Sequence, residues 1–173
     1  MDGCSRTLII FASFFTIAAL TLSIVGILTP SWYNFQDSNG NITYYNLFTQ
    51  CTNNVKNGSS KCTEISRENN FGIGTLYAAS FLIVAICLLG CGMLVVLAMN
   101  ITRLAGIFIF VAPILLFLAA LFMVASFAEL SRVTLYNSYS AILVQTSHVA
   151  TIFSLGLIAF AAGRLQNYFY QRF

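Results

Sequence analysis

The residues that could perform chemistry are few and far apart. The chain has a single histidine, His148, and only five carboxylates, and it contains no glycine-rich loop of the phosphate-binding kind. A hydrolase or transferase needs a nucleophile beside a base, or a metal held by several ligands. These residues cannot assemble either arrangement, so we expect no catalytic site, no metal site and no cofactor. The sequence predicts a protein that is not an enzyme.

Two of the five cysteines predict a covalent bond. Cys51 and Cys62 lie in one polar stretch, which also carries N-glycosylation acceptor motifs beginning at Asn41 and Asn57. Both features belong on an oxidising, glycosylating side of a membrane. The other cysteines fall elsewhere, so two thiols on that side permit one pairing, and we predict a Cys51–Cys62 disulfide. It would stabilise the fold by about 3 kcal/mol in the chain-entropy model. The alternative is two free thiols.

The other three cysteines are not expected to form disulfides. Cys4 precedes a long apolar run, where it could be palmitoylated at the inner leaflet. Cys87 and Cys91 are one helical turn apart in another apolar run, and we interpret them as small packing residues. A third acceptor motif begins at Asn100 in an expected cytoplasmic turn, so it should stay unmodified.

A polar stripe within the last apolar run is the remaining candidate site. Gln145, His148 and Thr151 follow one another at intervals of three residues. An ionisable group inside a membrane is a functional candidate by default. The alternative, which we favour, is a neutral imidazole bonded to a serine or threonine of a neighbouring helix, or to water. No carboxylate lies within the apolar runs to complete a proton relay.

Composition identifies the solvent of this chain as lipid. Hydrophobic residues make up 58% of the 173 residues and charged residues only 8%, against about 25% charged in soluble domains. The eight Lys and Arg are scattered, and the net charge is +3. No basic stripe for nucleic acid is present. The expected partners are therefore membrane lipid and other membrane proteins, and no nucleic acid.

Four apolar runs are long enough to span a bilayer as helices. We expect a single membrane domain over 1–173, with spans at 7–28, 71–99, 104–128 and 142–162. They are joined by an extracellular loop at 29–70, a cytoplasmic turn at 100–103 and an extracellular loop at 129–141, before a tail at 163–173. Pro113 predicts a kink within the third span. A cleavable signal peptide is the alternative for the first run, but that run is too long and lacks a cleavage site.

Charge and chemistry orient these spans. Basic residues divide equally between the two sides, but those in short segments such as Arg6 favour the cytoplasm. The acceptor motifs and the cysteine pair place the long loop outside. We predict a multi-pass plasma-membrane protein with both termini in the cytoplasm.

The long loop has strand-like segments. Residues 31–35 and 41–48 are rich in aromatic and β-branched side chains and flank an Asn-Gly turn at 39–40. Residues 132–136 could add a strand, and 51–62 is expected to be a polar turn at the tip. Glu129 should pair with Arg132. The predicted fold is a left-handed four-helix membrane bundle with a small extracellular antiparallel sheet.

Small residues recur at the spacing of such bundles. The first span has Ala12, Thr16, Ala19, Ser23 and Gly26, and the third has Ala105, Ala112, Ala119 and Ser126. Both sets follow a 3.5-residue period, which is typical of left-handed helix packing. We interpret them as contacts within the bundle, and contacts between copies are the alternative.

The loop resembles the claudin superfamily, which includes peripheral myelin and epithelial membrane proteins and the calcium-channel gamma subunits. That family has a Trp after its first helix, then Gly-Leu-Trp-x-x-Cys, then a second Cys. The matching positions are Trp32, Leu47, Phe48, Cys51 and Cys62, with Asn46 in place of the glycine and Phe48 in place of the second Trp.

The resemblance implies a non-enzymatic protein that works through lateral contacts and contacts between cells, in adhesion, junctions or membrane organisation. The alternative it implies is an auxiliary subunit of an ion channel or receptor. A protein of the occludin and synaptophysin type fits the short cysteine pair less well. Aromatic side chains of the loop would supply the contacts or, in part, pack the sheet on the helices; they are Trp32, Tyr33, Phe35, Tyr44, Tyr45 and Phe48.

Overall fold

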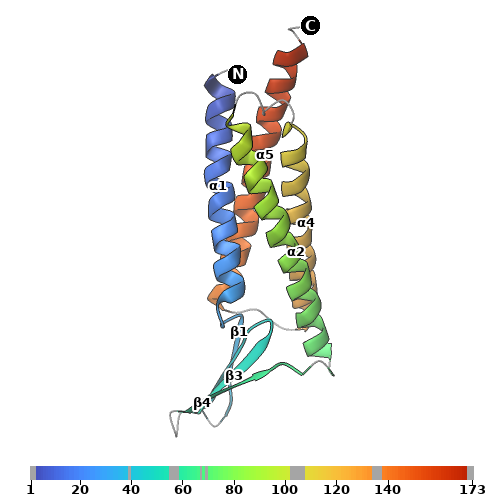
Figure 1. Cartoon of the computed structure of the whole chain (residues 1–173). Helices are drawn as coiled ribbons and strands as arrows, with labels where there is room; N and C mark the ends of the chain where they lie inside the picture. The colour runs from blue at the N-terminus through green and yellow to red at the C-terminus, as the bar shows by residue number, and fades with distance from the viewer. Residues whose placement is uncertain are drawn as a thin grey trace.

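A computed structural model describes residues 3–38, 40–54, 59–66, 68, 70–101, 108–133 and 138–170. Its long helices are α1 (Gly3–Leu28), α2 (Asn70–Met99), α4 (Val111–Val133) and α5 (Tyr139–Tyr170). All four are long and apolar enough to cross a membrane. They stand side by side with a small sheet at one end, while α1 begins and α5 ends at the opposite end (Figure 1). The predicted fold class is confirmed.

The bundle consists of two closely packed antiparallel pairs, α1 with α5 and α2 with α4. The small residues predicted to form a seam on the first span are all buried. On α4, Ala112, Ala119 and Ser126 are buried as well, whereas Ala105 lies outside the described residues. A Cβ built on Gly26 would collide with Val144 of α5. The small side chains therefore bring α1 and α5 into contact, because lipid supplies no hydrophobic drive between helices.

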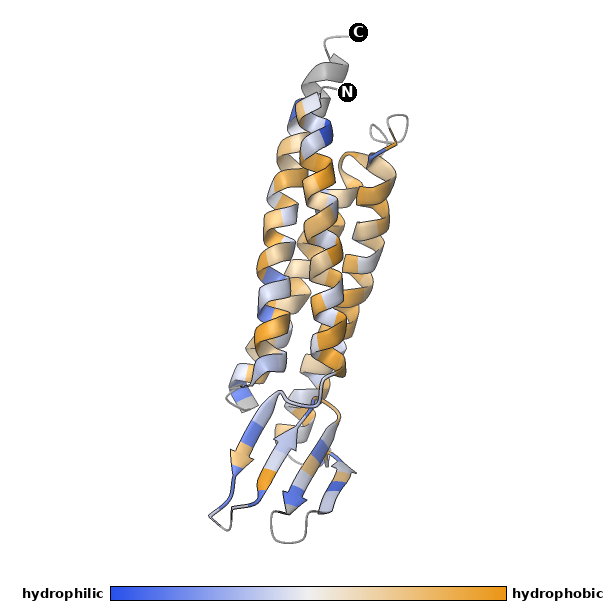
Figure 2. Ribbon diagram, turned by 90° about the vertical axis from the view of Figure 1, so that its left-hand side faces the viewer, coloured by the Kyte–Doolittle hydropathy of each residue, from blue (hydrophilic) through white to orange (hydrophobic). Residues whose placement is uncertain are grey.

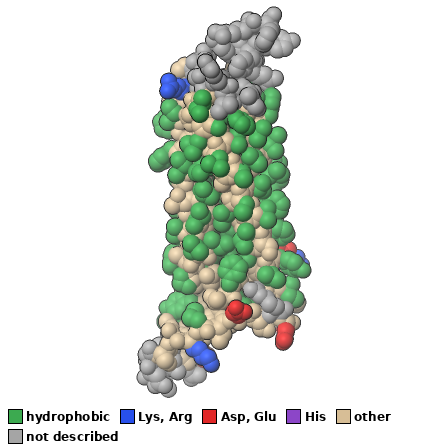
Figure 3. Space-filling model, in the orientation of Figure 1, with side chains coloured by type: hydrophobic (Ala, Val, Ile, Leu, Met, Phe, Trp, Pro, Cys, Tyr) green, Lys and Arg blue, Asp and Glu red, His purple; other side chains and the backbone are tan. Residues whose placement is uncertain are grey.

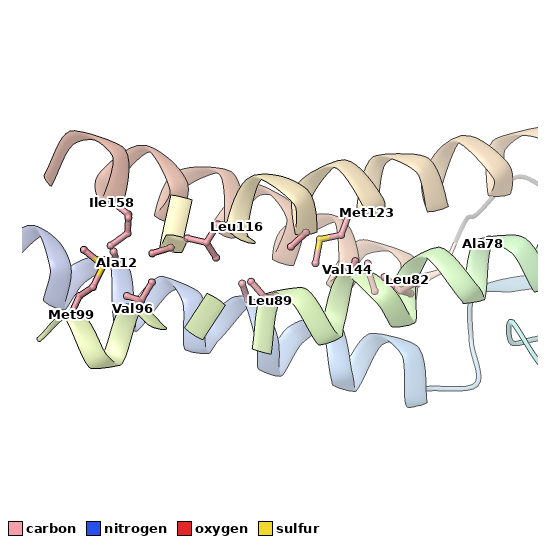
Figure 4. Packing of buried hydrophobic residues seen from close by; sticks show 14 of the residues in the cluster. Ala12, Ala78, Leu82, Leu89, Val96, Met99, Leu116, Met123, Val144 and Ile158 are labelled. Atoms are coloured by element: carbon pink, nitrogen blue, oxygen red, sulfur yellow. The ribbon is translucent and has the colours of Figure 1, made fainter. Parts of the chain in front are cut away.

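The apolar surface of the helices faces outward as well as inward. The helices are hydrophobic along most of their length and the sheet is polar (Figure 2), and apolar side chains cover the outside of the bundle (Figure 3). Phe14, Val149 and Ile114 are among many large exposed examples. Between the helices, Leu82, Leu89 and other buried side chains form a continuous core (Figure 4). An apolar exterior of this kind matches a lipid surrounding.

The sheet has four antiparallel strands in the order β1-β2-β3-β4. They are β1 (Tyr33–Gln36), β2 (Ile42–Tyr45), β3 (Thr49–Asn54) and β4 (Ser59–Glu64). In the turn between β1 and β2, Gly40 has a φ of 82°, a conformation that favours glycine. The prediction of a polar turn over 51–62 was wrong, because most of that segment forms β3 and β4. Their threonines suit a strand despite their polarity.

The third long helix departs from its predicted bounds. Residues 102–107 lie outside the described residues, and α4 runs from Val111 to Val133 instead of ending at 128. The helix continues because Leu130 is buried in the bundle and Arg132 pairs with Glu129 at 3.2 Å, as predicted. The strand predicted over 132–136 was therefore wrong at Arg132 and Val133, and its remainder lies outside the described residues.

The other helices also extend past the predicted spans. The helix α1 begins at Gly3 rather than at residue 7, and α5 runs from Tyr139 to Tyr170 rather than from 142 to 162. Pro113 falls in the first turn of α4, where a proline removes no helical hydrogen bond. It therefore does not produce the predicted kink within the span.

Candidate functional site

The junction between sheet and helices is built around the single tryptophan. Trp32 is only 3% exposed, and its indole Nε1 donates a hydrogen bond to the Gly26 carbonyl at 3.0 Å. Its backbone N–H donates to the Tyr45 carbonyl at 2.9 Å. Leu47 is buried in the same hydrophobic cluster as the helical core. Of the two roles expected for the aromatic residues, Trp32 has the packing role: it anchors the sheet on the bundle.

The bend between β2 and β3 holds the rest of the family motif. The Asn46 side-chain oxygen accepts a hydrogen bond from the Leu47 N–H at 2.5 Å, and the Asn46 N–H donates to the Thr49 carbonyl at 2.8 Å. The next residue, Phe48, has an exposed ring, while its carbonyl accepts the Ile65 N–H at 3.2 Å. Asn46 thus closes a tight turn that points Leu47 into the core.

The Cys51–Cys62 disulfide is present and joins β3 to the edge strand β4. The two cysteines are directly opposite in the pairing of β3 with β4. The bond therefore links two directly paired antiparallel strands. All the residues of β4 are exposed, so this strand has little packing of its own. The disulfide holds it to the sheet.

One face of the sheet divides into a covered part and a free part. Next to the helices, Tyr45 stacks against Tyr33 and Phe71, with ring centroids 5.8 and 5.3 Å apart. Burial raises the pKa of the Tyr45 phenol above its ordinary value, and the Coulombic effect of Tyr33 acts in the same direction. This part of the face is therefore engaged by α2.

The free part of the face is one row of paired residues farther from the helices. Phe35 is opposite Thr43, Thr43 is opposite Thr52, and Thr52 is opposite Lys61. Directly opposed residues point to the same side of a sheet, and the Thr43 and Thr52 hydroxyls are 3.3 Å apart. Phe35 is 52% exposed and Lys61 is exposed. We call these four residues the contact face: an aromatic ring at one edge and a cation at the other.

The polar stripe predicted within the last span is divided between different sides of α5. Gln145 is exposed and Thr151 is buried, with the Thr151 hydroxyl donating to the Ser147 carbonyl at 2.9 Å. His148 lies between them, against Phe127 at a ring distance of 6.1 Å, and its buried Nε2 has no hydrogen-bond partner among the described residues. No serine or threonine bonds this atom within the described part of the chain, and the imidazole has a hydrogen bond with the backbone of Ala120 instead.

What the structure does bring together on this helix is a row of hydroxyl pairs between α1 and α5. Thr16 contacts Ser154 at 2.6 Å, and Ser23 contacts Ser147 at 2.5 Å. Just beyond α1, Ser31 contacts Ser138 at 2.6 Å. We call these three pairs the hydroxyl ladder. Its α1 residues were visible as small seam residues, but nothing in the sequence indicated their partners 107 to 138 positions away.

The ladder satisfies its polar groups through backbone carbonyls of the same interface. The Ser147 hydroxyl donates to the Ala19 carbonyl at 2.7 Å, and the Ser154 hydroxyl donates to the Ala12 carbonyl at 3.1 Å. Each serine therefore links a side chain and the main chain of the facing helix. Buried hydroxyls of this kind are costly unless bonded, so the ladder fixes the alignment of α1 against α5.

The three cysteines outside the disulfide are all exposed. Cys4 is exposed, and the Arg164 guanidinium lies 3.5 Å from its sulfur. Cys87 and Cys91 are also exposed, so interpreting them as packing residues was wrong: they are on the outward side of α2.

Asn41 is half-buried beside the β1–β2 turn, and Asn57 lies outside the described residues. The Asn100 amide donates to the Ser13 hydroxyl at 3.1 Å. Within the described part of the chain, no three His, Cys, Asp or Glu residues group as metal ligands.

Comparison with known families identifies the family to which this chain belongs. The sequence profile of the PMP-22/EMP/MP20/Claudin family matches residues 5–169, nearly the whole chain. The chain belongs to this family. No curated protein matches the chain at a significant level. Membership in the PMP-22/EMP/MP20/Claudin family agrees with four helices able to cross a membrane and a disulfide-bonded sheet at one end of the bundle, and it points to a non-enzymatic multi-pass membrane protein.

Proposed function

We propose that this member of the PMP-22/EMP/MP20/Claudin family acts by contacts of its outer sheet with other membrane proteins, laterally and between cells. The observation that carries the proposal is the contact face, where Phe35 and Lys61 stand exposed beyond the part covered by α2. An exposed aromatic ring beside polar residues is typical of protein interfaces. The sheet is anchored through Trp32, so a contact made there is held rigidly on the membrane bundle.

The proposal requires the sheet to face the outside of the cell and both termini to face the cytoplasm. Two features support this orientation. The disulfide between Cys51 and Cys62 belongs to an oxidising compartment, and Asn41 begins an acceptor motif in the same sheet. The termini share the opposite end of the bundle (Figure 1). Plasma-membrane location and glycosylation at Asn41 and Asn57 form part of the same proposal.

A mixing experiment tests the contact between cells. Cells lacking the protein are made to express the full chain with one of two fluorescent labels, and the two populations are grown together. We expect enrichment at borders between two expressing cells, and loss of enrichment in the double variant Phe35→Ser with Lys61→Glu. The matched control is Gln36→Ser, because Gln36 is the exposed neighbour of Phe35 on the other side of β1.

Other outcomes of these experiments would exclude the contact face or decide between the two candidate roles. Unchanged border enrichment in the double variant, at normal surface level, would exclude the contact face. Absence of enrichment together with stoichiometric recovery of an ion channel or receptor from mild detergent would replace the proposal with an auxiliary-subunit role. Self-association confined to cell borders would exclude that second role.

A further inference from the structure

The single histidine of the chain has a buried ring nitrogen that the fold leaves without a partner. The Nε2 atom of His148 is buried and makes no hydrogen bond in the described part of the chain. The imidazole bonds the backbone of Ala120 on α4, so this bond belongs to Nδ1, which donates to the Ala120 carbonyl. Nδ1 therefore carries the proton of the neutral ring, and Nε2 keeps a free lone pair. A proton added to this ring binds at Nε2, where no described group accepts a hydrogen bond from it.

The helices around His148 contain no charge that could neutralise a protonated imidazole. The helices packed against α5 are α1 and α4. Residues 7–28 of α1 and 111–128 of α4 include no Asp, Glu, Lys, Arg, His, Tyr or Cys. The nearest titratable residues on α4 and α5 lie outside this region: Glu129, Arg132, Tyr139 and Arg164. A buried charge without a partner is unfavourable, so the packed bundle requires the neutral ring.

His148 lies where the two helix pairs of the bundle meet, which we call the pair boundary. It separates α1 and α5 from α2 and α4, and fewer residues touch across it than within either pair. Within the first pair the hydroxyl ladder holds the helices together, and within the second the Ser126 hydroxyl donates to the Ala78 carbonyl at 2.8 Å. The bond from His148 to Ala120 crosses the pair boundary, and so does its ring contact with Phe127. The orphaned nitrogen is therefore part of the weaker contact surface of the bundle.

The sheet is attached to both helix pairs at once. The Trp32 indole bonds Gly26 of α1 at 3.0 Å, and the Tyr45 ring packs against Phe71 of α2 with ring centroids 5.3 Å apart. His148 lies nine residues after the first residue of α5, about 14 Å along the axis, in the half of the helix next to the sheet (Figure 1). A change in the distance between the pairs near His148 therefore reaches the sheet.

We infer that His148 is a pH-sensitive switch between the two helix pairs. The neutral imidazole bonds Ala120, packs on Phe127 and keeps the pair boundary closed. When the medium is acidified, Nε2 takes a proton from it, and the resulting cation has no counter-ion inside the bundle. The ring then leaves the pair boundary for water or lipid head groups, the pairs separate at their sheet end, and the sheet loses one of its two attachments. The stability supplied by the neutral ring is present at neutral pH and lost as the pH falls.

Because the chain has one histidine, the protonation of His148 can be measured directly. The full chain, purified without a histidine tag and labelled with 15N in histidine, gives nitrogen signals from His148 alone in lipid nanodiscs. We expect a neutral ring with its proton on Nδ1 at about pH 7.5 and a cation at about pH 5, the interval in which histidine ordinarily titrates. A ring that stays neutral throughout, or one with its proton on Nε2 at neutral pH, would overturn the inference.

Distances between spin labels test whether the pairs separate. The three exposed cysteines are replaced by alanine, which leaves the disulfide, and new cysteines carry the labels. One label pair joins the exposed positions Val25 of α1 and Leu76 of α2, across the pair boundary. The control pair joins Val25 and Ile142 of α5, inside one helix pair. On acidification the first distance should lengthen and the second should stay the same.

Substitution of His148 shows whether the response belongs to this ring. His148→Phe keeps the ring contact and His148→Gln keeps a hydrogen-bond donor. Neither side chain titrates, so both variants should hold the neutral-pH distance in acid. The matched control is Gln145→His in the His148→Phe chain, because Gln145 is exposed one turn away and an imidazole there is protonated outside the pair boundary. This control should also show no lengthening.

Two results of the distance measurements would also overturn the inference. Equal lengthening in the native chain and in His148→Phe would assign the response to other titratable groups. Lengthening in the chain with Gln145→His would mean that a histidine anywhere on this part of α5 produces it.

Discussion

At the scale of single residues, the C-terminal end of α1 is where the sheet and the bundle depend on each other. The Gly26 carbonyl accepts the Trp32 indole at 3.0 Å and also the Thr29 hydroxyl at 3.1 Å. The absence of a side chain on Gly26 lets Val144 approach from α5. One glycine thus serves both the helix pair and the sheet anchor, so small changes there should affect both.

Replacing Trp32 with phenylalanine should loosen the sheet. The variant keeps an aromatic ring but loses the bond from the indole to Gly26 and leaves unfilled volume at a buried position. We expect a loss of about 1–3 kcal/mol in unfolding free energy, measured by circular dichroism during denaturation in mild detergent. Phe48→Leu, at an exposed ring, is the control and should change little. A Trp32→Phe protein as stable as the native chain would show that the anchor is dispensable.

Adding a methyl group at Gly26 should be harmful, and adding one at Gly90 should not. The new Cβ at position 26 would meet Val144 and lie 3.2 Å from the Ser140 carbonyl, whereas nothing lies within 4 Å at position 90. Overpacking of this kind costs about 1–3 kcal/mol. Gly26→Ala should unfold earlier and shift the emission of Trp32 to the red. Gly90→Ala should be neutral or slightly stabilising, and equal behaviour of the two variants would contradict this account.

The polar stripe shows that regular spacing along the sequence does not by itself place residues on one side of a helix. Steps of three residues rotate an α-helix by about 300°, so Gln145 and Thr151 are about 120° apart around the axis. One therefore faces the exterior and the other faces α1, with His148 between them. The three residues are neighbours in the sequence but lie on different sides of the helix.

At the scale of elements, the hydroxyl ladder aligns α1 with α5. Ser147 donates to the Ala19 carbonyl at 2.7 Å and contacts the Ser23 hydroxyl at 2.5 Å. Removing Ser147 leaves Ser23 without this partner, whereas removing Ser23 leaves the bond from Ser147 to Ala19 intact. The two serines are therefore unequal members of one pair.

A double-mutant cycle on this pair should reveal that asymmetry. We expect Ser147→Ala to destabilise more than Ser23→Ala, with a coupling free energy of about 0.6 kcal/mol and at most about 1.7 kcal/mol. The measurement is unfolding in detergent or bilayer for both single variants and the double variant. Thr21→Ala, at an exposed hydroxyl bonded to its own helix, is the control. If the two single substitutions change the unfolding free energy by amounts that simply add in the double variant, the contact between the Ser23 and Ser147 hydroxyls contributes nothing to stability.

The strands also show that the local sequence pattern does not predict every strand of the sheet. The segments around Tyr33 and Tyr44 were recognisable as strands because aromatic and β-branched residues favour them. The β3 and β4 strands are mostly polar, and β4 is exposed throughout. They are strands because β3 pairs with β2 and β4 pairs with β3. Pairing across the sheet, reinforced by the disulfide, decided their conformation.

At the scale of the whole molecule, sheet and termini lie at opposite ends of an apolar bundle (Figure 1). Because of this arrangement, one experiment that locates the sheet relative to the membrane also locates both termini. If the sheet faces the lumen during synthesis, Asn41 and Asn57 meet the glycosylation machinery and Asn100, next to the α2–α4 connection, does not. Asn100 also uses its amide to bond Ser13 of α1.

Removal of single acceptor sites should therefore change the gel mobility selectively. Asn41→Gln and Asn57→Gln should each lose one enzyme-removable glycan, and Asn100→Gln should match the unaltered chain. The check is mobility before and after glycosidase treatment of protein from mammalian cells. A glycan at Asn100, with none at the other two sites, would invert the proposed orientation.

The sequence by itself determined the solvent, the helices and the covalent bond. Runs of about 20 apolar residues can only be helices in lipid, because an unpaired backbone group there costs several kcal/mol, and Cys51 and Cys62 had no other partner on their side. Only the tertiary structure decided that α1 packs on α5, that Trp32 is buried and that Gln145 faces outward. These depend on which side of a helix meets which neighbour, and lipid is as apolar as the core. Hydrophobicity therefore could not distinguish the inside from the outside; contacts between residues far apart in the chain did.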